Sequence, residues 1–304
     1  LFLNLASSLI INYYFMLLNS IKKVSGVALA CSLLFISCSQ DEEEVMTSET
    51  LEETADLQVS QEILNQVEAL GMNTGYVKWD TFHFPDGTTE PRLYLEEDVV
   101  ITPDQLSALV ALNAQEKGDK TSKQYRTSAL VSQGRTISII GYTGGQQALS
   151  SKERTALQWA VDNYNRLSGV SISFNLTFGT NYQDKDMVVY NNTINNPSGA
   201  GGSAGFPSGG RPYKFVQIYG LANYDTNVVE HVITHEIGHS VGFRHTDWFS
   251  RQSCGQNVNE GGDVNYIPGT PSGFDPTSIM LACFSSSEDG EFNANDITAL
   301  RNMY

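Results

Sequence analysis

The stretch HEIGHSVGFRHTD, residues 235–247, contains three of the five histidines of this 304-residue chain. His235 and His239 are four residues apart, so on a helix both imidazoles lie on the same side, one turn apart. This is the reach that two nitrogens need to bind one zinc ion at about 2.0–2.1 Å. Glu236 follows the first histidine, where it can lie beside the metal without binding it and accept a proton from zinc-bound water.

A third histidine follows the predicted helix. Gly242 can end that helix, because glycine adopts a positive φ without steric cost. The chain then turns and brings His245 back as a third ligand. Three protein ligands leave a fourth position open for water, which is typical of catalytic rather than structural zinc. His231 lies one turn before His235 and could also face the metal, but we expect it at the surface or in the core.

Apolar periodicity predicts the elements around this motif. The zinc helix is expected to begin at Asn227, with Glu230 as the partner in a capping box. A second capping box, Ser150 with Glu153, opens a long amphipathic helix that continues to about Leu167. Strands are expected at residues 136–140, 171–177, 187–190 and 215–219. This β-α-β-β order predicts a mixed α/β sheet backed by the long helix.

The residues before this region are expected to form a smaller α+β module. Its apolar patterns predict a helix at 61–70, a β-hairpin around Pro85-Asp86-Gly87, and a helix from Thr102 to about Asn113. Residues 116–128 are polar and basic and have no apolar period, which favours an exposed linker.

The first forty residues have the pattern of a targeting segment. Lys22 and Lys23 precede an apolar run at residues 24–36 that is too short for a comfortable membrane span. The run ends before Cys38, which resembles a bacterial lipoprotein signal with Cys38 as the lipidated residue. An ordinary secretory signal cut nearby is the alternative. Met16 gives such a signal a better length. The predicted order is a signal at 1–38, an acidic tether at 39–60, a pro-domain or accessory module at 61–127, and a catalytic domain at 128–304.

Charge and cysteine content restrict the partners and the compartment. The formal net charge is -16, and 19 acidic but only 6 basic residues lie between Ser39 and Ser128. An acidic chain argues against nucleic acid as a partner, since phosphate binding needs a basic patch. The run SQDEEE at residues 39–44 resembles a surface-export signal of bacterial lipoproteins, or is a solvated spacer.

An exported chain left with Cys254 and Cys283 most simply forms one disulfide.

The histidine motif also resembles that of a known family. HExxHxxGxxH is the pattern of the metzincin clan of zinc endopeptidases, and HEIGH followed by a third histidine and Thr-Asp resembles the dual-action HEIGH metallopeptidases. The resemblance covers residues 128–304 and implies that Met280, in SIMLAC, forms an apolar floor under the ligands without binding zinc. It further implies that GSAGFP at 202–207 is an edge strand on which an extended substrate pairs. A flexible glycine loop is the alternative there. The C-terminal helix is expected from about Asn295.

Three positions near the methionine bear on the chemistry. Many clan members carry a tyrosine two residues after this methionine, where it can bind zinc or the oxyanion. Here the position holds Ala282, so the electrophilic partner is expected to be zinc alone. Asp247 is expected to hold the loop after His245 by hydrogen bonds. A bridge between Cys254 and Cys283 would pin Met280 relative to the zinc helix.

The front module allows two interpretations. It is either a pro-domain that covers the cleft until it is cut near Lys123 or Arg126, or a permanent spacer or binding module. Clan members often block the zinc with a carboxylate or thiol of the pro-segment. Because the front half has no cysteine after Cys38, the candidate blocking residues are Asp80, His83 and Asp86 on the hairpin. The alternative for each of them is an ordinary surface position without a role at the metal.

Together the motifs predict a secreted or surface-anchored zinc-dependent endopeptidase that hydrolyses internal peptide bonds through a zinc-activated water and a glutamate base. The expected fold is metzincin-like α+β: a mixed twisted sheet, a long backing helix, a zinc-binding active-site helix and a C-terminal helix, preceded by a small α+β pro-domain. We expect one catalytic Zn²⁺, protein or peptide substrates, a monomer, and a lipid anchor at Cys38 that holds it in the outer membrane or at the cell surface unless it is released. Calcium is not indicated. The alternatives are a non-catalytic surface lipoprotein that uses a protease-like fold for binding, and a zinc hydrolase with a non-protein substrate.

Overall fold

The structure is a computed structural model that describes residues 58–116, 124–258, 265–271 and 273–304. These residues all belong to one compact unit. The predicted signal, Cys38, Met16, nearly all of the predicted tether, and Lys123 lie outside the described residues. Within the described ranges, none of the helices combines the length and the apolar character that a membrane span requires.

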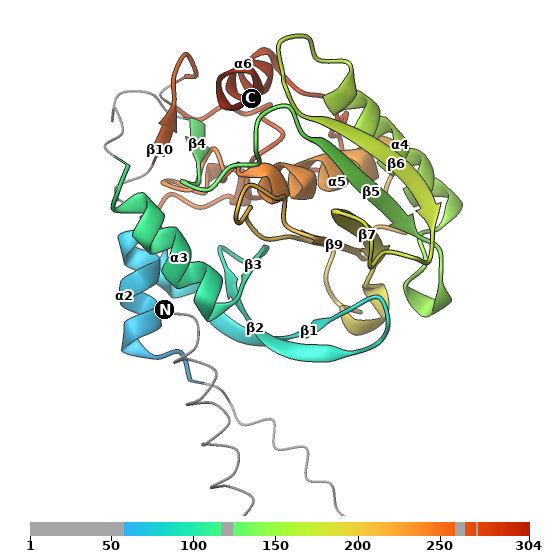
Figure 1. The fold of residues 1–304 in the computed structure, drawn as a ribbon, viewed down its shortest axis with the longest axis horizontal. Coiled ribbons are helices and arrows are strands. Elements are labelled where there is room, and N and C mark those ends of the chain that lie inside the picture. Colours follow the sequence, from blue (N-terminus) through green and yellow to red (C-terminus); the bar gives the residue numbers. More distant parts are fainter. Residues whose placement is uncertain (1–57, 117–123, 259–264, 272) are drawn as a thin grey trace, which may run out of the picture. The chain divides into compact units, whose positions relative to one another are not determined.

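A five-stranded mixed sheet carries the catalytic half of the chain (Figure 1). Its strand order is β6-β5-β7-β9-β8, with neighbours parallel except for the antiparallel pair β8 and β9. The strands are β5 (Thr136–Tyr142), β6 (Ser173–Gly179), β7 (Met187–Asn191), β8 (Gly201–Ser203) and β9 (Phe215–Tyr219). The predicted mixed sheet is confirmed, and the first residues of GSAGFP form its edge strand, β8.

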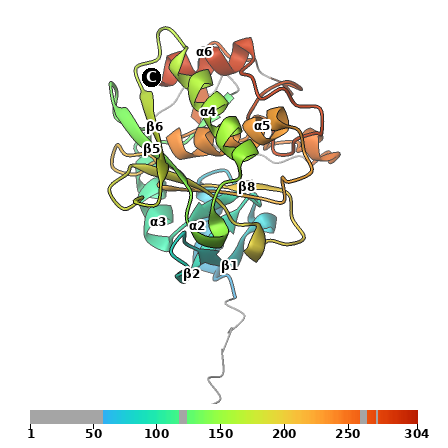
Figure 2. The same ribbon diagram turned by 90° about the vertical axis from the view of Figure 1, so that its right-hand side faces the viewer.

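Two long helices pack against each other and against this sheet (Figure 2). Helix α4 (Ser151–Asn165) begins with the predicted capping box: Ser150 Oγ accepts from the Glu153 backbone N–H, and the Glu153 carboxylate accepts from the Ser150 N–H. Helix α5 (Thr226–Val241) carries the HEIGH motif and is buried over nearly its whole length. Close packing around the buried side chains of α5 restricts them to single orientations.

The start of α5 differs from the prediction. Its N-cap is Asp225, and the capping box of Asn227 with Glu230 does not form. Glu230 instead accepts a hydrogen bond from Asn163 Nδ2 of α4 at 2.8 Å. The carboxylate is therefore used to join the two helices, a tertiary contact that the local pattern cannot reveal.

The front module contains the predicted hairpin and both predicted helices. Three antiparallel strands follow each other in the sheet order β1-β2-β3, and two helices cover one side of them (Figure 1). The elements are α2 (Gln61–Ala69), β1 (Lys78–His83), β2 (Thr89–Leu95), β3 (Val99–Ile101) and α3 (Pro103–Asn113). Val99 and Ile101 of β3 pack with Leu106 of α3 in a separate small core.

The front module also joins the catalytic half directly. Phe82 and Val100 lie in the same core cluster as the helices and strands of the large sheet. The Val100 N–H donates to Ala204 O at 2.6 Å, and the Ala204 N–H donates to Asp98 O at 3.0 Å. Residues 98–100 therefore run beside the chain that continues from the edge strand β8, with Val99 and Ala204 in a parallel bridge.

The predicted linker at 116–128 is wrong for its last part. Residues Gln124–Arg126 form strand β4, which pairs antiparallel with β10 (Asn265–Ile267). Tyr125 is buried there against Trp248, with ring centroids 5.4 Å apart. A three-residue strand is too short to show a period, so its burial could not be read from the sequence. The C-terminal helix α6 (Ala294–Met303) begins at the N-cap Asn293, close to the predicted start.

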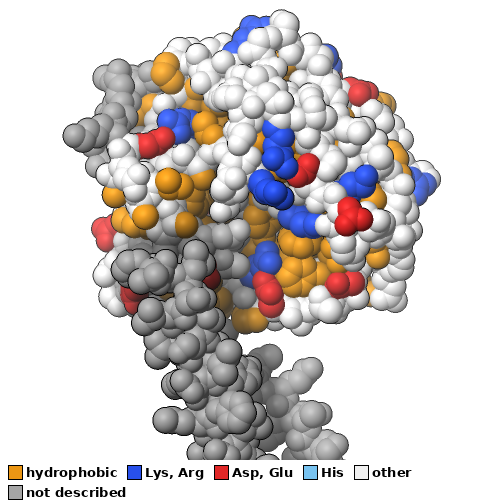
Figure 3. Space-filling model, viewed as in Figure 1, with side chains coloured by type: hydrophobic (Ala, Val, Ile, Leu, Met, Phe, Trp, Pro, Cys, Tyr) orange, Lys and Arg blue, Asp and Glu red, His pale blue; other side chains and the backbone are white. Residues whose placement is uncertain are grey.

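Charged side chains are interspersed on the face shown in Figure 3. Lys and Arg side chains there lie near Asp and Glu side chains, around partly exposed apolar area.

Candidate metal centre and catalytic cleft

The end of α5 brings the third histidine back towards the first two. His235 and His239 lie one turn apart on the helix, which ends at Gly242 with a left-handed φ of 113°. The Gly242 N–H donates to His239 O, and the Phe243 N–H donates to Gly238 O. These bonds close the helix end as predicted for a glycine cap. The chain reverses there and places His245 against the helix.

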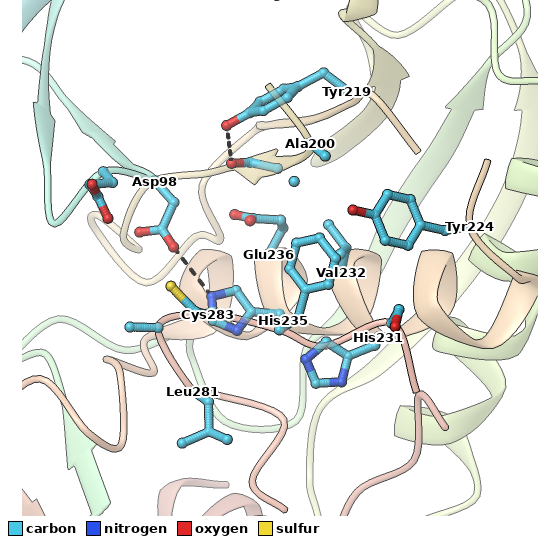
Figure 4. Close-up of a pocket in the computed structure, with 16 residues that line it drawn as sticks. Asp98, Ala200, Tyr219, Tyr224, His231, Val232, His235, Glu236, Leu281 and Cys283 are labelled. Atoms are coloured by element: carbon cyan, nitrogen blue, oxygen red, sulfur yellow. Dashed lines mark hydrogen bonds and ion pairs between the residues drawn. The ribbon is translucent and has the colours of Figure 1, made fainter. Parts of the chain in front are cut away.

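The three imidazoles converge on one point. The Nε2 atoms of His239 and His245 are 3.2 Å apart. One ring nitrogen of each histidine and a carboxylate oxygen of Asp98 all lie within 4.8 Å of one another. Two tetrahedral ligands at about 2.0–2.1 Å from zinc are themselves roughly 3.4 Å apart, so the observed spacing fits a metal ion between them. Figure 4 shows His235 and Asp98 facing each other at this point.

Backbone carbonyls orient two of the rings. His235 Nδ1 lies 2.8 Å from Ile279 O, and His239 Nδ1 lies 2.9 Å from Phe243 O. A carbonyl oxygen can only accept, so the proton sits on Nδ1 and the lone pair of each Nε2 faces the cluster. Metal-binding histidines typically have their other nitrogen held in this way. The donor set and its orientation therefore fit a zinc ion.

Asp98 supplies a fourth group, and it comes from the front module. Its Oδ2 lies 2.9 Å from His245 Nε2 and 3.5 Å from His235 Nε2, and its Oδ1 lies 3.8 Å from His239 Nε2. Burial opposes its charge, but the three imidazoles outweigh this and hold the pKa of Asp98 below its usual range. The same contacts raise the pKa of His245 to about 10, against its own burial.

The front-module residues that the sequence suggested as blocking groups are elsewhere. Asp80 pairs with Lys78 at 2.6 Å on β1. Asp86 accepts from the Thr88 hydroxyl at 2.6 Å in the hairpin turn. His83 is not among the groups that meet at the metal point. The front-module residue that lies at the metal point is Asp98, whose only sequence signal is the acidic triplet at 96–98 between two apolar runs.

A tight turn between β2 and β3 presents Asp98. Glu96 and Glu97 both have positive φ values, 50° and 80°, which are costly for residues with a side chain. The Glu96 carboxylate is buried and lies 3.0 Å from Arg244 Nη2. Burial opposes its charge, but Arg244 and His245 outweigh it and lower the pKa of Glu96 to about 2. Glu97 forms an ion pair with Arg251.

Glu236 lies next to the histidines and faces the cleft (Figure 4). It is almost completely buried, and its Oε2 has no hydrogen-bond partner among the described residues. Burial, together with the nearby Asp98 carboxylate, raises its pKa. The edge strand passes very close, since a Cβ added to Gly202 would lie 2.5 Å from Glu236 Cγ. Gly202 is thus a site residue that the sequence indicated only as part of a glycine-rich strand.

Comparison with known proteins identifies the family. The model of the dual-action HEIGH metallopeptidases matches residues 93–304, which is more than half of the chain. The chain belongs to this family. Among curated protein sequences, none matches it.

Three solved structures show a distant similarity to this chain. Two structures of myroilysin are 15% and 14% identical to this metallopeptidase, with TM-scores of 0.37, and cover 58% and 62% of this chain and 82% and 88% of their own. High choriolytic enzyme 1, a hatching enzyme zinc-protease from Oryzias latipes (Medaka fish), is 17% identical, with a TM-score of 0.35, and covers 58% of this chain and 94% of its own. At such values these structures add no argument about the site.

Met280 lies beneath the histidines of this HEIGH metallopeptidase. It is fully buried, and the Thr246 N–H donates to its carbonyl at 2.8 Å. A Cβ added to Gly238 would lie 2.5 Å from Met280 Sδ. The glycine of HEIGH therefore lets the thioether pack directly on the helix between the two histidines, where an apolar floor was expected.

Two links join the loop after His245 to the segment of Met280. Asp247 accepts from the Ala282 N–H at 2.9 Å and from the Ser253 hydroxyl at 2.7 Å. Cys254 and Cys283 form the predicted disulfide, with Cα atoms 5.1 Å apart. Asp247 thus has the structural role that we expected. The segment of His245 and the segment of Met280 are therefore held in fixed positions relative to each other.

An open cleft of about 420 Å³ runs along α5 from this point (Figure 4). One wall is the edge strand, where the Tyr219 hydroxyl donates to Gly202 O at 2.9 Å. His231 lies in the wall and does not belong to the group that could bind a metal. Its pKa is lowered to about 3, mainly by burial and also by His235. The lining residues are Glu97, Asp98, Ala200, Gly201, Gly202, Tyr219, Tyr224, His231, Val232, His235, Glu236, Leu281, Ala282, Cys283, Phe284 and Ser286.

Proposed function

We propose that this metallopeptidase hydrolyses internal peptide bonds of proteins with one zinc ion, held by His235, His239 and His245, and with Glu236 as general base. The observation that carries the proposal is the convergence of the imidazole nitrogens beside a buried carboxylate that has a free oxygen. A metallopeptidase family and an open cleft at the same residues agree with it.

The roles of the protein groups follow from their positions. Bound zinc would supply polarisation of the scissile carbonyl and acidification of the attacking water. Glu236 Oε2 accepts the proton of this water and returns it to the leaving amine nitrogen. Burial and the nearby Asp98 carboxylate raise the pKa of Glu236, so this carboxylate is a stronger base than an exposed glutamate. The edge strand β8 aligns an extended substrate by backbone hydrogen bonds.

Glu236→Gln tests this assignment. General acid–base catalysis contributes about 10²- to 10⁴-fold, so casein cleavage should fall by that factor. The zinc content of the purified protein should stay at one ion per chain, because the glutamate is not a ligand. Chelator treatment should abolish the activity of the unchanged chain, and added zinc should restore it. Unchanged activity in Glu236→Gln, with zinc bound, would refute the role of Glu236.

We further propose that residues 61–127 act as a pro-domain that keeps the full chain latent. Asp98 lies where the fourth position of the metal would be, and Val100 pairs with Ala204 beside the edge strand. A peptide substrate needs both the fourth position at the metal and the free backbone groups beside the edge strand. Of the expected cut positions, Arg126 lies in β4, paired with Asn265, so a cut there would have to open a strand pair.

A cut before β4 tests the latency. A recognition sequence for a specific protease replaces residues 117–123, which leaves the β4–β10 pair intact. Cleavage of this chain should raise the rate of casein digestion. A chain with the unchanged residues 117–123, treated with the same protease, is the control. Equal rates before and after the cut would mean that the front module does not inhibit.

We propose, from the sequence alone, that Cys38 is lipidated and that the protein is anchored at the cell surface. Two or more acyl chains at one cysteine would hold it firmly. Cys38→Ser should move the protein from the detergent phase to the aqueous phase in detergent partitioning. A protein that stays in the aqueous phase with Cys38 present would exclude the anchor.

A further inference from the structure

The cleft continues past Glu236 into a pocket with aromatic walls. Tyr224 and Phe284 contact each other edge to face with ring centroids 5.7 Å apart, and the Phe284 ring centroid lies 6.5 Å from that of His231. Val232 of α5 also lines the cleft. Figure 4 shows Tyr224, Val232 and His231 on the side of Glu236 that is opposite to Asp98. This aromatic pocket is therefore open beside the catalytic carboxylate while Asp98 occupies the other end.

His231 places one unpaired polar atom in this apolar surrounding. Its side chain is 3% exposed, and its Nε2 has no hydrogen-bond partner among the described residues. A buried polar atom without a partner costs about 1–3 kcal/mol, so native structures seldom leave one unused. His231 lines the open cleft, so a bound molecule that packs against its ring can supply the partner.

The neighbour of the other ring nitrogen decides what kind of partner fits. A neutral imidazole has one N–H donor and one accepting nitrogen. Glu288 Oε2 lies 3.9 Å from His231 Nδ1, and its negative charge favours the proton on Nδ1. Nε2 then carries the lone pair and accepts a hydrogen bond. The aromatic walls favour a flat apolar body, because rings gain from edge and face contacts with other rings.

We propose that the aromatic pocket binds the substrate side chain next to the scissile bond, that it selects tyrosine, and that His231 is the residue that recognises the tyrosine hydroxyl. This inference rests on the proposed peptidase function. The phenol ring packs against the wall that Tyr224 and Phe284 form together, and its hydroxyl donates to His231 Nε2. Phenylalanine fills the same space but leaves Nε2 unpaired in a site from which water has been displaced, which is how a polar site rejects an apolar analogue.

Binding of small phenols tests the pocket without any catalysis. The full chain is titrated with p-cresol, which has the ring and the donor, and with toluene, which has the ring alone. The His231 Nε2 resonance should move on addition of p-cresol, which should bind about three- to tenfold more tightly than toluene, the range expected for one net hydrogen bond. Anisole, which can only accept, should behave as toluene does. Equal affinity for p-cresol and toluene would overturn the proposal.

Peptide cleavage tests the same residue in the reaction. Peptides that differ only in the residue beside the scissile bond carry tyrosine, phenylalanine or lysine there, and the enzyme is the full chain activated by Asp98→Ala. The ratio of kcat/KM for tyrosine over phenylalanine should be about three to ten and should fall to about one in His231→Leu. Tyr224→Phe is the matched control: it removes the other hydroxyl of the pocket and should keep the ratio.

The two experiments separate this inference from the proposed function. If no peptide is cleaved, the peptidase proposal fails, while binding of p-cresol still reports on the pocket. If peptides are cleaved without a preference for tyrosine, or with a preference for lysine, the peptidase proposal stands and the inference is wrong. Should His231→Leu not fold, the preference of the unchanged residue for p-cresol over toluene decides the question alone.

Discussion

The three histidines and the turn at residues 96–98 meet at one point, but they are held there by different means. His235 and His239 are oriented by carbonyls of the buried core, and a disulfide and Asp247 tie the loop after His245 to the floor. The turn is held in a costly backbone conformation, and two ion pairs to arginines fasten it. The histidines are thus held by the core and by covalent and hydrogen-bonded links within the catalytic half, whereas the turn is held by ion pairs to side chains of that half.

This difference suggests that the turn at residues 96–98, rather than the histidines, can move away from the metal point. Two left-handed residues other than glycine cost about 1–3 kcal/mol each, and they persist only while their surroundings compensate. The compensating contacts of Glu96 and Glu97 all reach across to the catalytic half. Under the proposed activation, a cut before β4 would let the front module separate, which would relieve the turn and leave the histidines in place. The following changes test the two sides separately.

The largest effect is expected from the disulfide. Cys283→Ser opens a bridge between residues 29 positions apart, and the loop-closure model gives a loss of about 3–4 kcal/mol in the free energy of unfolding. The midpoint of urea unfolding measures this loss. Cys254→Ser should give the same value, and the double variant should add nothing. A much smaller loss would mean that Asp247 and the core already hold the floor.

Asp98→Ala should have the next largest effect, on activity rather than on stability. A hydrogen bond between charged groups is worth about 1.5–3 kcal/mol, so casein cleavage by the full chain should rise roughly 10- to 100-fold. Asp80→Ala is the matched control from the same module. Its exposed pair with Lys78 contributes little, and the rate should not change. A fall in activity in Asp98→Ala would instead make Asp98 a required ligand.

Gly238→Ala tests how closely the floor fits the helix. The added Cβ would lie 2.5 Å from Met280 Sδ, so the thioether must move. Overpacking of this kind costs about 1–3 kcal/mol, which thermal unfolding would measure, and zinc affinity should weaken as the floor shifts. Gly179→Ala is the control, because its Cβ would meet only Ile140 Cδ1 at 3.6 Å. Equal stability of the two variants would show that Met280 adapts freely.

The smallest effect concerns the strain in the turn. Glu97→Gly and Glu97→Ala both remove the ion pair of the exposed Glu97 with the buried Arg251, but only glycine accepts the φ of 80° without cost. The glycine variant should therefore be more stable than the alanine variant by about 1 kcal/mol. Urea unfolding of the two variants side by side gives this difference. An alanine variant that is as stable as the glycine variant would argue that the turn carries no strain.

The sequence predicted those features that local rules determine. The capping box at Ser150, the glycine cap at Gly242 and the helical spacing of His235 and His239 depend on residues within one or two turns. The disulfide was predicted because Cys254 and Cys283 are the two cysteines that remain after the predicted signal of an exported chain. All of these agree with the structure.

The features that the sequence did not predict are contacts between distant segments. Asp98 lies 147 residues before His245, and an acidic triplet between strands resembles an ordinary exposed turn. The strand pair of β4 with β10 joins two three-residue segments, neither of which has a period. Glu230 seemed to be a cap partner because its spacing from Asn227 fits, yet its carboxylate is used by Asn163 of another helix. Local spacing carries no information on any of these contacts.

The bridge between Cys254 and Cys283 has a consequence for the cell that makes the protein. Thiols stay reduced in most cytosols, so a newly made chain there lacks the covalent tie between the third histidine and its floor. The arrangement of His245 and Met280 gains its full rigidity only in an oxidising compartment. Under the proposed export and latency, the proteolytic centre would be completed only outside the compartment where the cell's own proteins fold.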